Sequence, residues 1–383
     1  MEAFLDALSS LGQGFANLSG QAVIMLILGG VLLYLGTGKK IEPLLLIPIG
    51  FGVVLGNLPL AGLSAHDKGG VINLLYIGGV LTGLFPVLLF IGLGAMIDFG
   101  PLLANPIVLI FGAAGQFGIF LTLLLALALG FSREQAVSIS IIGAMDGPTA
   151  IYVTSRFARE LLPAVSIAAY SYMSLVPIIQ PPIMRALTSQ KERAILMTTA
   201  QRKVSQRAKI LFPLVTAVLT ILIAPMGAPL MGMLMLGNFM RESGVIKRLV
   251  DVSENTLANI VTLFLGLTIG ASMLGSNFLR WQTILVFALG LLAISLDTVT
   301  GVLLGKLMRV LTRGKINPLI GAAGTSAFPM SARVVQKEGQ KANPRSFLLW
   351  HAIGANTGGQ IGSVTAAAIM LAVMAGMGIL PQP

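Results

Sequence analysis

The sequence predicts an all-α, polytopic membrane protein made of two similar halves, whose interrupted helices meet near the middle of the membrane. Of its 383 residues, 55% are hydrophobic and only 10% are charged, and the mean hydropathy is +0.90. A soluble domain is about 25% charged, so this composition indicates a membrane protein. Since a span needs about 20 apolar residues, the chain has room for roughly nine to eleven spans. Its 45 Gly and 19 Pro residues gather inside the apolar runs, which predicts helices that are broken within the membrane.

Charge and residue types exclude several classes of function. The net charge of +11 does not indicate nucleic-acid binding, because the basic residues lie in the loops between spans, as in other membrane proteins. The chain has no Cys and only two His residues, which are far apart in sequence, so a zinc or iron site is not expected. Residues 301–307 match a P-loop only in part. Energy must therefore come from an ion gradient or from a partner.

The first membrane half, residues 20–182, follows an amphipathic segment at residues 1–19. Apolar residues recur in that segment at helical spacing, which predicts a helix on the membrane surface; they are Phe4, Leu8, Leu11, Phe15 and Leu18. The apolar runs that follow, some of them broken by Gly and Pro, lie at about 20–36, 41–58, 71–98, 105–130 and 161–180.

Residues 143–149, with the sequence GAMDGPT, combine a buried acid with a helix break. A carboxylate at membrane depth is costly, so Asp146 is expected to face a cavity or a partner on an ion path. Gly143, Gly147 and Pro148 interrupt the helix at the same place. A polar surface loop is the alternative, and the apolar residues on both sides disfavour it. The stretch has what a transporter's cation site requires.

Residues 183–209 form a basic linker between the halves, with seven Lys or Arg residues against one acid, Glu192. Such an excess marks a cytoplasmic segment. Two interpretations stay open: contact with anionic lipid headgroups and docking of a partner protein.

The second half, residues 210–383, contains another broken segment at residues 317–329 and a last span at about 346–375. Asp297 lies within the apolar stretch 282–308. It is either a second ion ligand or, as we expect, a structural acid that pairs with Lys306, because no Gly-Pro break surrounds it. The other apolar stretches lie at about 210–224, 229–240 and 256–275.

The two halves resemble each other, which predicts an internal repeat with a binding site between its breaks. Each half has an interrupted helix with an oxygen-bearing residue, and each break is followed by a polar cluster within a span. Chance similarity of glycine-rich helices is the alternative. The expected ligands are mostly short oxygen donors, which suit sodium better than a soft metal; they are Asp146, Thr149, Tyr172, Asn317, Thr325, Ser326 and Asn356, with backbone carbonyls. Arg333 could pair with Asp146, receive an anionic group, or be an ordinary loop-end arginine.

Four long motifs resemble the β subunit of the sodium-pumping biotin-dependent decarboxylases, a family that includes the oxaloacetate, glutaconyl-CoA, methylmalonyl-CoA and malonate enzymes. The resemblance extends from about residue 15 to 375, and the motifs occupy residues 143–151, 169–177, 317–329 and 355–363. It implies an inverted-repeat fold in the bacterial inner membrane and a subunit that decarboxylates carboxybiotin, takes up a proton and exports sodium. The implied partners are a biotin carrier that supplies carboxybiotin in trans, a carboxyltransferase α subunit, and a small γ or δ membrane subunit, in a homotrimeric arrangement.

The resemblance also implies the residues that act. Sodium ligands fall on Asp146, Asn317, Gly321, Ser326 and Asn356, and carboxybiotin contacts fall on Arg333 and Asn356. The catalytic residues it implies are Asp146, Tyr172 and Arg333.

Physical reasoning suggests a role for each of these residues. Asp146 is anionic with sodium bound and takes up a proton when sodium leaves, since burial disfavours the charge. Tyr172 is a candidate proton relay, and Arg333 a candidate for holding the carboxylate of carboxybiotin. Asp297 belongs to none of the family motifs. The alternative function is a secondary sodium–carboxylate symporter with a similar inverted-repeat fold; a structural scaffold fits a buried Asp in a broken helix poorly.

Overall fold

The computed structural model describes residues 12–197 and 203–379, and this part of the chain is helical throughout, without a strand. The all-α prediction is therefore confirmed. Residues 1–11 of the proposed surface helix lie outside the described residues; its remainder holds one exposed turn, α2 (Gln13–Ala16). The first-half helices are α3 (Gly20–Thr37), α4 (Pro43–Gly56), α5 (Val71–Leu75), η1 (Tyr76–Leu81), α6 (Leu84–Met96), α7 (Gly100–Ala104), η2 (Pro106–Val108), α8 (Leu109–Ala114), α9 (Phe117–Ala128), α10 (Arg133–Ser140), η3 (Ile141–Ala144), α11 (Gly147–Phe157), η4 (Arg159–Leu161), α12 (Leu162–Leu187) and α13 (Gln190–Arg193).

The second half also consists of helices and short helical turns. Its helices are α14 (Gln206–Ile223), η5 (Pro225–Gly227), α15 (Ala228–Ser243), α16 (Lys247–Asp251), η6 (Val252–Leu257), α17 (Ala258–Ser272), α18 (Gly275–Phe278), α19 (Trp281–Leu311), η7 (Pro318–Ala323), α20 (Met330–Ala342) and α21 (Leu349–Gly376).

By length and composition, seven helices in the described part of the chain can cross a membrane, or eight if the bent pair Val71–Leu81 and Leu84–Met96 counts as one span. This is fewer than the nine to eleven predicted. The reason is that some apolar runs form shorter helices: α4 has 14 residues and α15 has 16. The bent pair turns by 61° at Gly83, whose φ of 77° is left-handed and therefore suits glycine.

The helices pack through glycines that let two backbones touch. A Cβ added at Gly94 of α6 would clash with the carbonyl of Leu234 of α15, and one at Gly237 of α15 would clash with the carbonyl of Ile91. The α4–α17 pair is built the same way, with Gly52 against Leu267. In a membrane such close van der Waals contact replaces hydrophobic burial as the main force between helices.

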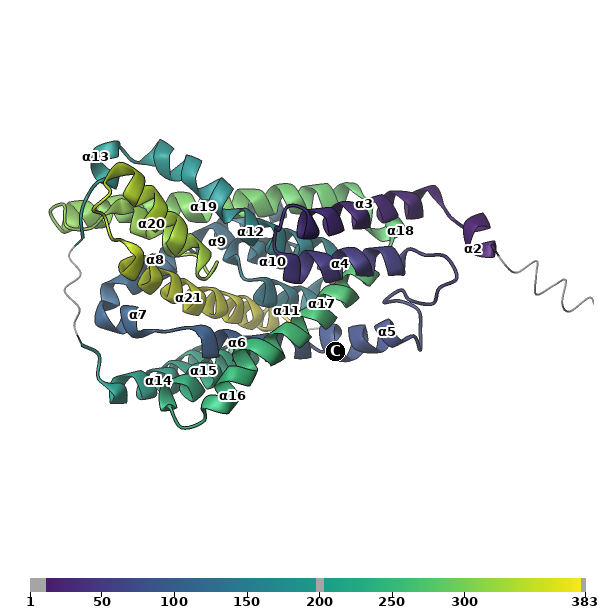
Figure 1. The fold of residues 1–383 in the computed structure, drawn as a ribbon, viewed down its shortest axis with the longest axis horizontal. Helices are drawn as coiled ribbons and strands as arrows, with labels where there is room; N and C mark the ends of the chain where they lie inside the picture. The colour runs from purple at the N-terminus through teal and green to yellow at the C-terminus, as the bar shows by residue number, and fades with distance from the viewer. Residues whose placement is uncertain (1–11, 198–202, 380–383) are drawn as a thin grey trace, which may run out of the picture.

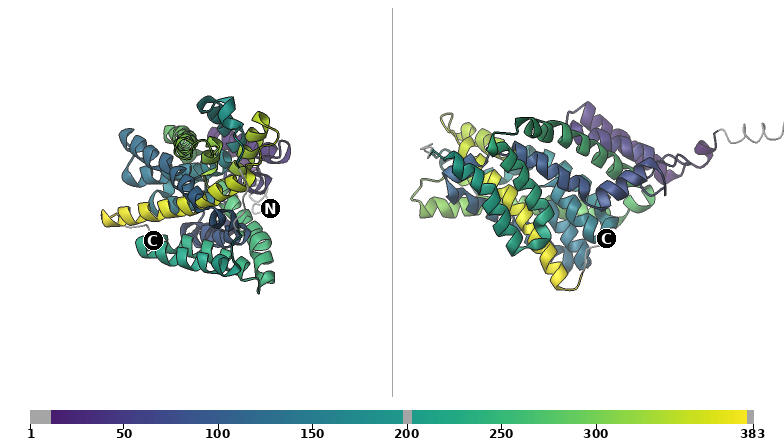
Figure 2. Two further views of the ribbon diagram at one scale, coloured as in Figure 1. Left: turned by 90° about the vertical axis from the view of Figure 1, so that its left-hand side faces the viewer. Right: turned by 90° about the horizontal axis from the view of Figure 1, so that it is seen from below.

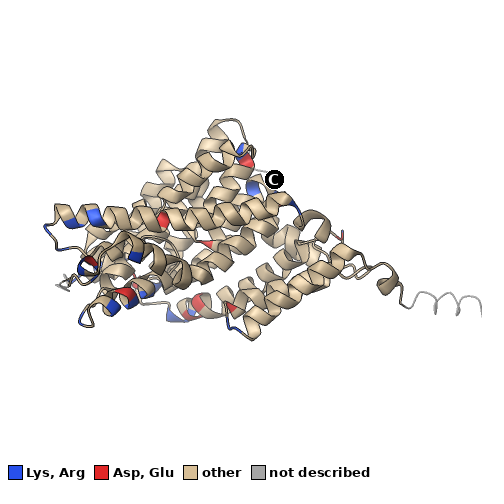
Figure 3. Ribbon diagram, turned by 90° about the horizontal axis from the view of Figure 1, so that it is seen from above, with Lys and Arg blue, Asp and Glu red and all other residues tan. Residues whose placement is uncertain are grey.

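The long helices α19 and α21 organise the molecule. α19 runs from α18 at one end to α13 and α20 at the other (Figure 1). α21, drawn in yellow, crosses the molecule above the teal helices α14 and α15 in the left view of Figure 2. Lys and Arg residues gather at the end where α19 finishes, while the middle of the molecule is almost free of charge (Figure 3). Both broken segments are held against these two helices, as described below.

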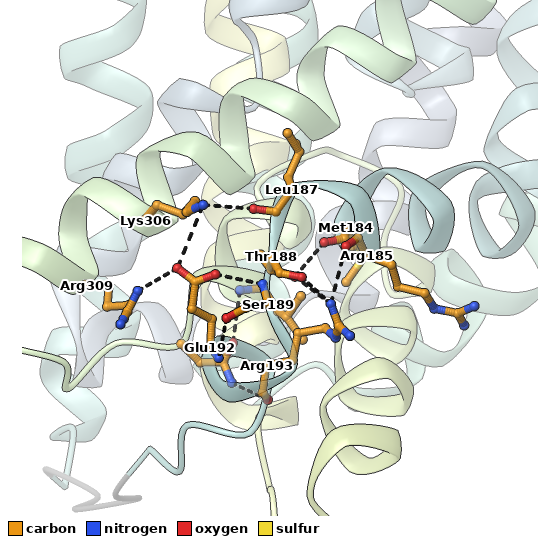
Figure 4. Close-up of polar contacts among 11 residues, drawn as sticks. Met184, Arg185, Leu187, Thr188, Ser189, Glu192, Arg193, Lys306 and Arg309 are labelled. Atoms are coloured by element: carbon orange, nitrogen blue, oxygen red, sulfur yellow. Dashed lines mark hydrogen bonds and ion pairs between the residues drawn. The ribbon is translucent and has the colours of Figure 1, made fainter.

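The linker folds back onto this charged end. Ser189 caps α13 through a reciprocal bond with Glu192, and the Glu192 carboxylate also receives the Arg309 guanidinium at 2.5 Å and lies 3.8 Å from Lys306 (Figure 4). Burial raises the pKa of Glu192, but the bonds from Ser189 and the charges of Lys306 and Arg309 outweigh it and lower the pKa. These contacts thus fix the linker to the C-terminal end of α19.

The pairing predicted between Asp297 and Lys306 is wrong. The Lys306 ammonium donates to the carbonyl of Leu187 at 3.0 Å and lies beside Glu192 instead. Asp297 accepts a bond from the backbone N–H of Gly118 at 2.5 Å. The two side chains are nine positions apart in α19 (306 − 297), about two and a half turns, so they reach different surroundings.

Candidate functional site

Asp146 ends the first break and starts α11. The chain leaves η3 through Met145, whose φ of 53° is left-handed, a conformation that a non-glycine residue adopts only under constraint. Asp146 then caps α11: its Oδ2 accepts the Thr149 hydroxyl at 2.7 Å, and its Oδ1 lies 3.5 Å from the Thr149 backbone nitrogen. Pro148 suits the first turn of the helix because its missing N–H is not needed there. The local sequence thus aims the carboxylate into the protein.

Helix α21 supplies the other partners of this carboxylate. Gln360 donates to Asp146 Oδ2 at 2.8 Å and Ser363 at 3.2 Å. Residues three positions apart share one face of a helix, so α21 presents both donors together. Among the described residues Asp146 forms no ion pair, and its side chain is 3% exposed. Neutral donors alone leave a full negative charge uncompensated at membrane depth, which favours a cation or a proton.

A cavity of about 170 Å³ opens beside Asp146. Its polar lining includes Asp146, Tyr170, Thr262, Ser326 and Gln360, and Leu89, Leu93, Met145, Met173 and Phe328 are among its apolar walls. The Tyr170 ring lies so close to Gly147 that a Cβ there would clash with it. The cavity is large enough for an ion with part of its hydration shell, because one water molecule occupies about 30 Å³ in the liquid.

The second break reaches the same cavity through α21. The Ser326 hydroxyl donates to the carbonyl of Gly359 at 3.1 Å, and the Asn356 amide donates to the carbonyl of Thr325 at 2.5 Å. Asn356 Oδ1 is buried and has no hydrogen-bond partner within the described part of the chain. Ser326 and Asp146, 180 positions apart (326 − 146), thus line one cavity.

Gln116 ties the second broken segment to its neighbours. Its amide nitrogen lies 3.3–3.4 Å from the carbonyls of Gly112, Gly324 and Gly359. It therefore connects α8, the second break and α21 at one point. Gly115 and Gly324 meet without room for a side chain, so this segment is held by backbone contact as well.

The structure does not bring every expected ligand to Asp146. The Asn317 amide donates to the carbonyls of Arg193 and Ile195, both at 2.9 Å, and its oxygen caps the N–H of Leu319. This fixes the start of the second broken segment to the linker. Gly321 packs against Gly301 of α19, where a Cβ would clash with the carbonyl.

Two of the expected catalytic residues also lie apart from the carboxylate. The Tyr172 hydroxyl donates to the carbonyl of Phe287 at 2.7 Å, away from Asp146. Arg333 is exposed in the first turn of α20 and forms no ion pair with any described residue, Asp146 included. Its guanidinium is therefore accessible just beyond the second break.

Gln360, Ser363 and Tyr170 belong to the site although sequence reasoning assigned them no ligand role. Gln360 and Ser363 lie in the polar run 355–363 on the face of α21 that also carries Asn356, at spacings of four and three residues. That spacing was the available signal. Tyr170 and Tyr172 are equivalent by sequence, because both lie in one polar cluster; only the rotation of α12 decides which ring enters the cavity.

Comparison with known proteins places these features in a family. The model of the Na⁺-transporting oxaloacetate decarboxylase beta subunit matches residues 21–374. The chain belongs to this family. It is 49% identical to the methylmalonyl-CoA decarboxylase subunit beta of Propionigenium modestum, over 97% of this chain and 99% of that protein. The glutaconyl-CoA decarboxylase subunit beta of Acidaminococcus fermentans is 49% identical over 98% of this chain and its own whole length. The oxaloacetate decarboxylase beta chain of Klebsiella pneumoniae is 46% identical over 96% of this chain and 99% of its own.

Proposed function

We propose that this chain is the membrane-embedded subunit of a decarboxylase sodium pump that decarboxylates carboxybiotin, consumes a proton and exports sodium. One observation carries the proposal: a buried carboxylate with only neutral donors lies in a cavity between two broken helices, in a chain of the sodium-transporting decarboxylase family. The relatives carry the names of decarboxylases for three different substrates, yet match this chain at 46–49% identity. A common intermediate, carboxybiotin, explains why one kind of subunit would serve all three.

Sodium is the cargo, and Asp146 is its proposed anionic ligand. Ser326, Thr149, Gln360 and Ser363 supply neutral oxygens near the carboxylate or in the same cavity. Asn356 is a further proposed ligand because its side-chain oxygen is buried and unpaired among the described residues. Asn317 and Gly321 take positioning roles in this proposal, since they fasten the second break to the linker and to α19.

The decarboxylation needs a place for a carboxylate and a source of a proton. Release of the carboxyl group leaves an electron pair on a ureido nitrogen, which takes up one proton. Arg333, exposed and without an ion pair in the described structure, fits the carboxylate. Tyr170 lines the Asp146 cavity, whereas Tyr172 would have to leave the carbonyl of Phe287 to relay a proton. Both phenols are candidates for the relay.

The proposed partners are a biotin carrier, a carboxyltransferase α subunit and a small γ or δ membrane subunit, around a homotrimer of this chain in the bacterial inner membrane. The basic end with α13 and α20 is assigned to the cytoplasm (Figure 3). Arg333 belongs to α20 at that end, where a soluble carrier can reach it.

Reconstitution into vesicles tests the proposal. With the carrier and the carboxyltransferase present, the wild-type chain should take up sodium-22 as substrate is decarboxylated. Asp146→Asn should abolish uptake while the protein remains inserted and assembled, because the amide cannot supply the charge. Wild-type rates in that variant would refute the site. Sodium–carboxylate symport by the isolated chain, without any carrier, would refute the decarboxylase function in favour of a symporter.

A further inference from the structure

Asp297 is a second acid in the interior of the molecule, outside the proposed sodium site. It lies in the middle of α19 and is 0% exposed. Its Oδ1 accepts one bond, from the N–H of Gly118 in the first turn of α9, at 2.5 Å. Its Oδ2 is buried and has no hydrogen-bond partner among the residues that the structure describes. A buried polar atom without a partner is rare in proteins and needs an explanation.

No cation near Asp297 can explain it. The elements packed against the middle of α19 are α8, α9, α10, α12, η3 and η7, and α8, α9, η3 and η7 contain no Asp, Glu, Lys, Arg, His or Tyr. The titratable groups of α12, α10 and α19 itself are engaged elsewhere or lie at the helix ends. They are Tyr170 in the Asp146 cavity, Tyr172 on Phe287, Arg185 on Glu338, Arg133 and Glu134 in the first turn of α10, and Lys306 and Arg309 on Glu192.

An ionised carboxylate cannot persist in these surroundings. Burial of the charge without a counter-ion carries a large desolvation cost even after relaxation, and a single N–H donor offsets only part of it. A group in this position becomes neutral instead. The carboxyl therefore carries a proton, and the unpartnered Oδ2 is the atom that carries it, because Oδ1 already accepts the N–H of Gly118.

Asp297 also touches the first break from behind. A Cβ added at Gly143 would lie 3.1 Å from Asp297 Oδ2, and Gly143 is the third residue before Asp146. Asp297 forms no hydrogen bond with Asp146. Any rearrangement of η3 that accompanies filling or emptying of the Asp146 cavity changes the surroundings of Oδ2 directly.

From these observations we propose that Asp297 is a proton-binding site, which holds a proton in the described conformation and whose proton is linked to cation occupancy on the other side of the η3 break. Two negative charges on either side of one short helix repel strongly in a medium of low dielectric constant. The linkage is reciprocal: what sodium does to the proton on Asp297, that proton does to sodium binding. Only the linkage rests on the proposed function; the protonated state does not.

Infrared difference spectroscopy on the full-length chain in lipid vesicles tests both parts. Without sodium, and at a pH where water-exposed aspartates are fully ionised, the wild type should show the C=O stretch of a buried carboxylic acid. One component of the band should shift on ¹³C-aspartate labelling, vanish in Asp297→Asn and persist in Asp146→Asn. A component from Asp146, which is itself expected to take up a proton without sodium, should be lost in Asp146→Asn instead. Asp67→Asn, a change of an exposed loop acid, is the matched control and should leave the band unchanged.

Adding sodium separates the outcomes. We expect the component that Asp297→Asn removes to shift in frequency or intensity with sodium in the wild type and not in Asp146→Asn. Absence of an aspartic-acid band, or a band that is unchanged in Asp297→Asn, would refute the proton site whatever the transport activity is. A component of Asp297 that ignores sodium would refute the linkage. If Asp297→Asn does not fold, the labelled wild type and Asp146→Asn still decide, since a band lost entirely in Asp146→Asn would belong to the wrong acid.

Discussion

At the scale of single residues, most hydrogen bonds to the Asp146 carboxylate reach the same oxygen, Oδ2. Thr149, Gln360 and Ser363 all donate to Asp146 Oδ2, whereas Oδ1 has only the distant Thr149 N–H. The donors come from α11 and α21, two helices that are far apart in sequence. They hold the carboxylate in place without neutralising it, so the charge remains available to a cation. The double contact from α21 therefore makes that helix part of the site.

Gln360→Ala should weaken sodium binding while the maximal rate changes less. The variant removes one bond to a charged oxygen, worth about 1.5–3 kcal/mol, or about ten- to more than a hundred-fold in sodium affinity. The sodium dependence of decarboxylation in the assembled complex measures it. Ser295→Ala, which removes a half-buried hydroxyl that bonds only within α19, is the control and should match the wild type. Equal sodium requirements in the Gln360 variant and the control would contradict the geometry.

Asp146 and Ser326 should behave as members of one site, because they line one cavity. Ser326→Ala should raise the sodium requirement several-fold, as a lost neutral contact of about 0.5–1.5 kcal/mol does. Asp146→Asn, which should abolish sodium uptake, should lower the maximal rate of decarboxylation as well. Since neighbours in one site are not additive, the double variant should be no worse than Asp146→Asn alone in the same assay. Strictly additive losses would indicate two independent sites.

At the scale of elements, the linker and the second broken segment form one unit at the basic end. Asn317 bonds to the carbonyls of Arg193 and Ile195, and Glu192 bonds to Arg309 at the end of α19 (Figure 4). A movement of α13 would therefore pull on η7 directly. This arrangement gives the basic linker a structural role besides the lipid or partner contacts that its charge predicts.

Glu192→Gln should loosen α13 without changing the fold of the core. The amide keeps the size of the side chain but loses its charge beside Lys306 and Arg309, and with it the charge-assisted bond. Trypsin should then cut after Lys191 and Arg193 several-fold faster in native vesicles. Lys191→Gln, a change of an exposed neighbour, serves as the control for altered charge. An unchanged rate of cleavage after Arg193 would show that the contacts of Glu192 do not hold the linker in place.

The pair formed by Arg185 and Glu338 should make the docking of α20 depend on pH. Arg185 bonds to Glu338 at 2.7 Å, and with Lys341 it lowers the pKa of Glu338 to about 2 despite burial. A carboxyl whose pKa is depressed by folding contributes stability that is complete above its ordinary pKa of 4.5 and is lost as the pH falls toward about 2. The temperature of thermal unfolding should thus fall less steeply between pH 5 and 2.5 in Glu338→Gln than in the wild type. Parallel curves would contradict the prediction.

At the scale of the whole molecule, backbone contacts at glycines bring the helices together around the buried apolar side chains. Gly321 of the second broken segment and Gly301 of α19 exclude a side chain from each other's position. The same holds for Gly324 with Phe111 and for Gly94 with Leu234. The first two contacts hold the second broken segment in the interior, away from lipid.

Gly321→Ala should destabilise the folded protein severely. The added methyl group would meet the backbone of Gly301, which cannot move as a side chain can, so we expect a loss of about 1–3 kcal/mol or more. Thermal melting in detergent, read by the fraction of protein that stays unaggregated, measures it. Gly30→Ala, where the new Cβ meets open space within α3, is the matched control and should be neutral or stabilising. Equal melting temperatures would refute the close crossing.

Composition and local pattern determined the class of this protein and the positions of its two breaks, and they singled out Asp146 as a candidate, because the cost of burying a charge or breaking a helix in a membrane depends on the residue itself. The inverted-repeat relation of the halves stays a prediction. Only the tertiary structure decided which groups these side chains contact. Gln360 and Ser363 reach Asp146, Tyr170 and not Tyr172 enters the cavity, Asn317 turns to the linker and Asp297 meets Gly118. Each choice depends on how far a helix is rotated and on what crosses it, and glycine contacts between distant segments set both.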